Sequence, residues 1–68
     1  MNLKELAEQY WGRQVSVQLD DGKVFRGEVF DYISEPDNEP DPESIVIETD
    51  GGMLVELFVN EIKEVTVI

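Results

Sequence analysis

The carboxylates of this chain are concentrated between positions 35 and 43, in the segment EPDNEPDPE. Five of its nine side chains are acidic and three are prolines. Such a segment suits three roles: a metal-binding loop, an anionic surface that recognises a partner, or a spacer between strands. We take its carboxylates as a candidate partner-binding set, which comprises Glu35, Asp37, Glu39, Asp41 and Glu43.

Calcium binding is the first role to consider, because calcium prefers carboxylate oxygens. Carboxylates at residues 37, 39, 41, 43 and 48 match positions 1, 3, 5, 7 and 12 of a twelve-residue calcium loop. Pro42, however, occupies position 6, where the sharp turn requires glycine, and residues 45–48 are typical of a strand. We therefore expect no specific metal site and no cofactor, only weak association of divalent cations.

Catalysis has little support among the remaining residue types. The chain has no His and no Cys, which removes the commonest general base, zinc ligand and thiol nucleophile. Carboxylate pairs such as Asp20 with Asp21, or Glu28 with Asp31, have no glycine-rich phosphate loop or nucleophile to work with. We expect the protein not to be an enzyme.

Length and charge narrow the function further. The 68 residues make one small domain, residues 1–68. Sixteen acidic residues against five basic ones give a net charge of −11, which repels phosphate backbones and disfavours nucleic acid as a partner. The absence of cysteine, of a charged-then-apolar leader and of a long apolar run predicts a cytoplasmic protein without a membrane span.

A helix over residues 2–11 is the first element expected to position these side chains. Asn2 can cap its start, and Gly12 can end it in a left-handed conformation. Apolar residues recur at the spacing of one helical face. We expect that face to enter the core with Leu3, Leu6, Ala7, Tyr10 and Trp11.

Five strands are expected after the helix, because apolar and polar residues then alternate with a period of two. A turn that ends at Gly22 joins the first two strands, and Asp50-Gly51-Gly52 joins the third to the fourth. The expected strand ranges are 14–20, 23–33, 44–49, 53–59 and 63–67.

The strand 23–33 carries apolar side chains on both faces. Strict alternation would place Val29 on one face of this strand and Phe30 and Tyr32 on the opposite face. Gly27 stands in the middle of the strand, where glycine allows a sharp bend or a close approach of another backbone. We therefore expect this strand to contribute to both halves of a small barrel.

The fold class that follows is mainly β: an N-terminal helix and a strongly bent, partly open barrel of five antiparallel strands. The acidic loop 34–43 should be extended and held away from the barrel, because its prolines cannot extend a ladder and its carboxylates repel one another. The last two strands are β-rich and lightly charged, so another chain could add to their edge. We assign this candidate assembly edge to Val55, Leu57, Val59, Val65 and Val67.

The motifs VSVQLDDGKVFRGEVFDYI, SIVIETDGG and MLVELFVNEIKEVTVI, in this order around an acidic insertion, resemble the Sm-like (LSm and Hfq-type) family. The most specific shared element is the hydrophobic-Asp-Gly hairpin through Gly22, followed by Gly27 and Val29. The resemblance spans roughly the whole chain. It implies an SH3-like five-stranded barrel capped by a helix, often assembled into rings through the fourth and fifth strands.

The RNA-binding residues of that family are mostly replaced in this chain. Tyr32 falls where the first motif has an aromatic residue, but Ile33 and Asp37 stand in place of its Asp and Asn, and FVNEI replaces the basic pair of the second motif. Arg26 and Tyr32 remain as candidate RNA contacts. A degenerate Sm-like RNA-binding protein is therefore one alternative.

VQLDDGKVF and VELFVNEIKEV also resemble the family of Rho-binding antiterminators, small Sm-like bacterial proteins that use an acidic surface against another protein. That resemblance implies a regulator that binds a transcription termination factor, which is a second alternative. Our main expectation is a non-catalytic binding or assembly module, for which a protein partner or self-association is favoured over RNA. The plainer reading is that the charge only keeps a small barrel in solution and the insertion only connects strands.

Overall fold

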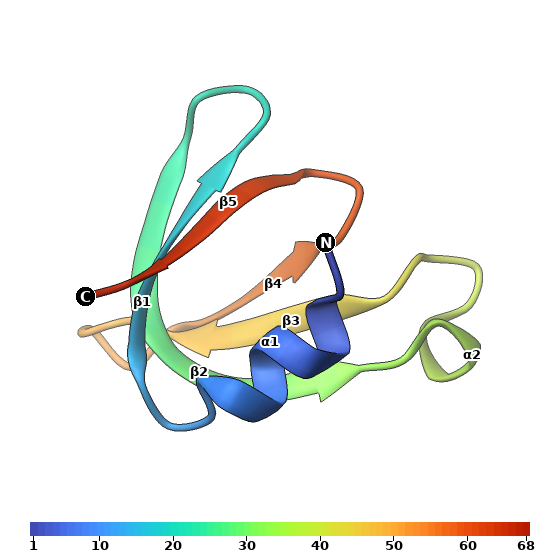
Figure 1. Cartoon of the computed structure of the whole chain (residues 1–68), viewed down its shortest axis with the longest axis horizontal. Helices are drawn as coiled ribbons and strands as arrows, with labels where there is room; N and C mark the ends of the chain where they lie inside the picture. Colours follow the sequence, from blue (N-terminus) through green and yellow to red (C-terminus); the bar gives the residue numbers. More distant parts are fainter.

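The computed structural model describes all residues 1–68 as two helices and one sheet of five antiparallel strands in the order β4-β3-β2-β1-β5 (Figure 1). This confirms the expected fold class, a mainly β domain in which an N-terminal helix precedes five antiparallel strands. The sheet bends like a barrel but is not closed, because β4 and β5 do not pair. The element bounds are α1 (Leu3–Gln9), β1 (Gln14–Leu19), β2 (Val24–Ile33), α2 (Glu35–Asn38), β3 (Ser44–Glu48), β4 (Leu54–Phe58) and β5 (Ile62–Val67).

The ten-residue strand β2 belongs to both halves of the bent sheet (Figure 1). Its residues 24–28 pair with β1, and its residues 28–33 pair with β3. Gly27 lies next to this change of partner. A Cβ atom built on Gly27 would collide with the carbonyl oxygen of Glu48 and lie 2.8 Å from its carbonyl carbon. Only glycine allows two backbones to approach so closely.

A β-bulge interrupts the alternation of side chains along β2. Val29 pairs with Ile47 and Asp31 pairs with Val46, which leaves Phe30 as the extra residue. The bulge reverses the face on which later side chains lie, so Tyr32 pairs with the fully buried Ile45. The expectation that Tyr32 and Phe30 share the face opposite Val29 was therefore wrong for Tyr32.

The core lies between the concave side of the sheet and α1, which packs on β2 and β3. Tyr10 and Phe25 are among the half-buried side chains at its margin. The ten residues of the core are Leu3, Ala7, Val15, Val17, Leu19, Val29, Ile45, Ile47, Leu57 and Ile62.

Helix α1 begins as expected, because the Asn2 side chain accepts a hydrogen bond of 3.1 Å from the N–H of Glu5. It ends at Gln9 rather than at residue 11. The N–H of Arg13 donates to the Tyr10 carbonyl oxygen at 2.8 Å, and Gly12 has φ +75, so the chain leaves the helix in a tight turn. Trp11 belongs to this turn and is 56% exposed, which corrects its expected place in the core.

Candidate interaction surfaces

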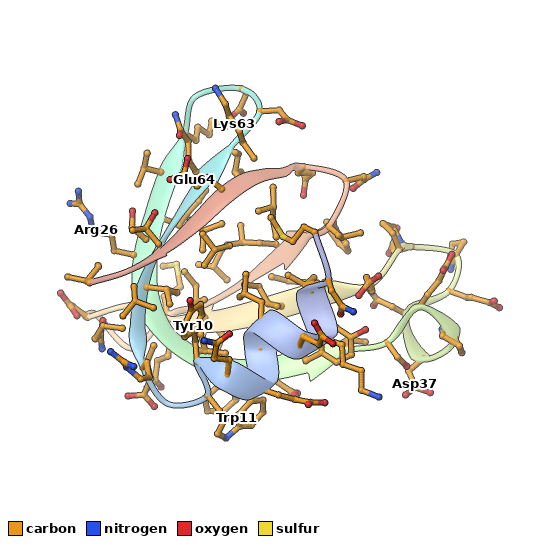
Figure 2. The ribbon with its side chains drawn as sticks, in the orientation of Figure 1. Tyr10, Trp11, Arg26, Asp37, Lys63 and Glu64 are labelled. Atoms are coloured by element: carbon orange, nitrogen blue, oxygen red, sulfur yellow. The ribbon has the colours of Figure 1, made fainter.

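The acidic segment is folded rather than extended, which corrects the expectation for residues 34–43. Its start forms the short helix α2, in which the N–H of Asp37 donates to the carbonyl oxygen of Ser34 at 3.1 Å. Pro36 favours this turn, because proline fits the first positions of a helix. Figure 2 shows Asp37 pointing away from the barrel at one end of the molecule.

A short chain of hydrogen bonds fastens this segment to the barrel. The Asn38 Nδ2 donates to the Pro42 carbonyl oxygen at 2.7 Å and to the Ser44 Oγ at 3.4 Å. The Ser44 Oγ in turn donates to the Glu56 Oε2 on β4 at 2.7 Å. Ser44 is fully buried, so its hydroxyl needs these partners. Sequence reasoning missed this network, because a serine and an asparagine are ordinary loop and strand residues until their neighbours are known.

Glu43 differs from the other four carboxylates of the predicted set. Glu35, Asp37, Glu39 and Asp41 are exposed, whereas Glu43 is half-buried and accepts a hydrogen bond of 2.8 Å from the Tyr32 hydroxyl. This hydrogen bond raises the pKa of Tyr32 above its ordinary value, and burial and the negative charge of Glu43 raise it further.

The outer edge of β4 has unpaired backbone groups. Hydrogen bonds join Thr49 to Met53 and Val59 to Glu43, so the odd-numbered residues 53–59 direct their backbone groups towards β3. The groups of Leu54 and Glu56 therefore point away from the sheet. Next along this edge, the Phe58 N–H donates to the Glu61 Oε1 at 3.3 Å, so that side chain covers one end of the edge.

The outer edge of β5 is open in the same way. The N–H of Ile68 donates to the Gln14 carbonyl oxygen at 3.0 Å, so residues 64, 66 and 68 direct their backbone groups towards β1. The groups of Val65 and Val67 point outward. Exposed apolar side chains stand beside both edges: Met53 and Leu54 at β4, and Ile68 at β5.

The structure divides the predicted assembly residues into two groups. Val65 and Val67 supply free backbone groups, as an edge requires. Val55, Leu57 and Val59 do not, because their backbones bond to β3 and their side chains pack in or against the core. On β4 the free backbone groups belong instead to Leu54 and Glu56.

Arg26 and Tyr32, the candidate RNA contacts, do not form one site. Arg26 is exposed on the strand position that pairs with Ser16, and Figure 2 shows it projecting from the side of the molecule opposite Asp37. Tyr32 lies beyond the bulge, with its hydroxyl held by a carboxylate. The remaining predicted glycine, Gly22, has φ +92 in the β1–β2 turn, a conformation that glycine adopts readily.

One depression, with a volume of about 220 Å³, lies between the β1–β2 and β4–β5 turns. Its lining contains three carboxylates and one amide; the residues are Leu19, Asp20, Asp21, Asn60 and Glu61. No group of three or more His, Cys, Asp or Glu side chains is gathered in a metal-binding arrangement. None of the helices has the length and apolar character needed to span a membrane.

No protein-family model matches the chain, and no curated protein or solved structure shows significant similarity to it.

Proposed function

We propose that this protein is a non-catalytic, Sm-like binding or assembly module to which a protein strand, from a partner or from a second copy, adds at an open sheet edge. The observation that carries this proposal is that the outer edges of β4 and β5 have no partner strand, and that exposed apolar side chains lie beside each edge. Outward N–H and C=O groups on a strand are a template for another strand. The N-terminal helix and the strongly bent β2 are also features that the Sm-like resemblance implies.

Each edge offers a short but usable ladder. Leu54 and Glu56 on β4, and Val65 and Val67 on β5, each carry one free donor and one free acceptor. An added strand would satisfy these groups and cover the apolar side chains next to them. Natural proteins usually protect such edges with charge or bulges. Here the Glu61 carboxylate covers one end of the β4 edge, and the edge strands carry three charged residues, Glu56 on β4 and Lys63 and Glu64 on β5. The free groups of the two edges are otherwise uncovered.

RNA is the less favoured partner. Single-stranded RNA needs aromatic platforms together with cations that contact phosphate. Here the net charge is −11, and Arg26 and Tyr32 lie apart on β2. An acidic protein-binding regulator of the Rho-binding antiterminator type remains a special case of the proposal, because it also takes a protein as its partner.

The first test is to block an edge without disturbing the intramolecular ladder. Val67→Pro removes an N–H that points outward from the edge strand β5, and Leu54→Pro changes the first residue of β4. Proline is tolerated on an edge strand where the N–H faces solvent and at the first residue of a strand. We expect both variants to retain the thermal stability of the wild-type chain and to lose its self-association or its bound protein. Val67→Thr is the matched control, because it keeps the N–H and the branched shape.

Sedimentation velocity measures self-association against the monomer mass of 7.8 kDa, and pull-down from cell extract, compared across variants, measures partner binding. A wild-type chain that stays monomeric, and that retains the same proteins as Val67→Pro, would contradict the proposal. Binding of a fluorescent oligo-U or oligo-A in about 150 mM salt, lost in Tyr32→Ala, would favour the RNA alternative instead.

A further inference from the structure

Two large aromatic side chains lie in water on the surface of this protein. Trp11 is 56% exposed and Phe30 is 47% exposed. The other four aromatic residues, Tyr10, Phe25, Tyr32 and Phe58, are half-buried. Exposed aromatic residues of this size are often anchors of protein interfaces.

Backbone hydrogen bonds bring the two exposed aromatics to one junction. The N–H of Gly12 donates to the Val29 carbonyl oxygen at 3.1 Å, and the N–H of Val29 donates to the Arg13 carbonyl oxygen at 3.0 Å. Trp11 and Phe30 are the chain neighbours of these bonded residues. Figure 2 shows Trp11 below the end of α1, projecting away from the barrel. We call these two side chains the aromatic pair.

Both members of the aromatic pair stand at departures from regular structure. Phe30 is the extra residue of the bulge in β2, and Trp11 immediately precedes the left-handed Gly12. Bulges are built features that often redirect a side chain. For Trp11 the departure changes the position of the side chain, because regular helical spacing would place it in the core; Phe30 lies on the face opposite Val29, where regular alternation also places it.

The charges around the aromatic pair indicate the chemistry of the partner. Glu8 precedes Trp11 by three residues, and Glu28 and Asp31 stand within two residues of Phe30. Arg13, two residues after Trp11, is the only basic residue within three residues of either aromatic residue in the chain. None of these four groups forms an ion pair, because the only ion pair of the chain joins Lys23 to Asp21, at 3.9 Å.

We propose that the aromatic pair is a docking surface for a basic, arginine-containing segment of a partner protein. A guanidinium over an aromatic face gains both cation–π attraction and stacking, and the nearby carboxylates complement its charge. This proposal rests on the proposed function in taking a protein as the partner, but it uses a surface separate from the strand edges.

The test uses nona-arginine and nona-lysine peptides as probes of equal charge, in about 150 mM salt. Trp11 is the only tryptophan, so its fluorescence reports binding at this surface directly. We expect the arginine peptide to shift the Trp11 emission to shorter wavelength and to bind more tightly than the lysine peptide. By calorimetry, Trp11→Ala and Phe30→Ala should each weaken its binding about two- to fivefold, and Trp11→Phe should restore most of the loss.

Val24→Ala is the matched control, because Val24 is 49% exposed on the same strand but lies at its other end. It should leave peptide binding unchanged. Equal affinity for the two peptides, with no effect of either aromatic substitution in a folded protein, would show attraction by charge alone and overturn the proposal. Loss of peptide binding in Val67→Pro would also overturn it, while leaving the edge-binding function intact.

Discussion

Individual side chains fasten the acidic segment at two points. On the concave side, the Tyr32 hydroxyl reaches Glu43, and on the other side Asn38 and Ser44 connect the segment to Glu56. The bulge in β2 is what turns Tyr32 towards Glu43. The side chain that a sequence motif would assign to base stacking is thereby engaged with a carboxylate of its own chain.

The Tyr32–Glu43 hydrogen bond predicts a specific loss of stability at alkaline pH. The folded state raises the pKa of Tyr32 above its unfolded value of about 10, so it holds the proton more tightly than the unfolded chain does. The contribution of Tyr32 is therefore complete below pH about 10 and is lost as pH rises through the folded pKa. Tyr32→Phe should cost about 0.5–1.5 kcal/mol at pH 8, and this difference should shrink as the wild-type tyrosine ionises.

Urea unfolding of both proteins, from pH about 8 to pH about 11.5, measures this difference directly. The two chains differ only at position 32, so the comparison isolates the contribution of the Tyr32 hydroxyl. Free-energy curves that stay parallel over the whole range would mean that the hydrogen bond contributes nothing to folding.

Among the elements, β2 decides the shape of the domain. It changes partner from β1 to β3 around Glu28, bulges at Phe30 and meets the backbone of Glu48 at Gly27. The bend folds the two ends of the sheet around one core. It also leaves β4 and β5 as edges without a partner inside the chain.

Gly27→Ala should be strongly destabilising for this reason. Its new Cβ would meet backbone atoms of Glu48, which cannot rotate away, and overpacking of this kind costs about 1–3 kcal/mol. In a domain of this size, each kcal/mol lowers the Tm by about 4–8 °C in thermal unfolding. Gly51→Ala is the control, since nothing lies within 4 Å of the position that its new Cβ would take, and it should be neutral or slightly stabilising. Similar Tm values for the two variants would show that the close approach does not constrain the fold.

For the molecule as a whole, the dominant feature is unbalanced charge. Sixteen acidic side chains face five basic ones, and only one ion pair forms, between two exposed groups. The repulsion among the carboxylates destabilises the compact state and also opposes the assembly of identical chains. Strand addition at the open edges, which acts at short range, favours that assembly. The balance between these effects should therefore depend on ionic strength.

We expect the Tm to rise with sodium chloride between about 10 and 300 mM, because screening weakens repulsion among the carboxylates. The double variant Glu39→Gln/Asp41→Asn, at two exposed positions without side-chain hydrogen bonds, should raise the low-salt Tm and reduce its salt dependence. Differential scanning calorimetry measures both quantities. A wild-type Tm that is flat or falling over this range would show that repulsion is not a significant term.

The class of fold could be predicted from the amino-acid sequence, because hydrophobic periodicity, glycine turns and the helix cap are local signals. Asn2, Gly12 and Gly22 stand where those signals put them. Which side chains meet depended instead on long-range packing. One extra residue in the β2 ladder reversed the face of Tyr32, and a tight turn after α1 moved Trp11 into water. Likewise, which backbone groups of β4 and β5 remain free depends on hydrogen-bond register between strands distant in the chain, which no local pattern of residues specifies.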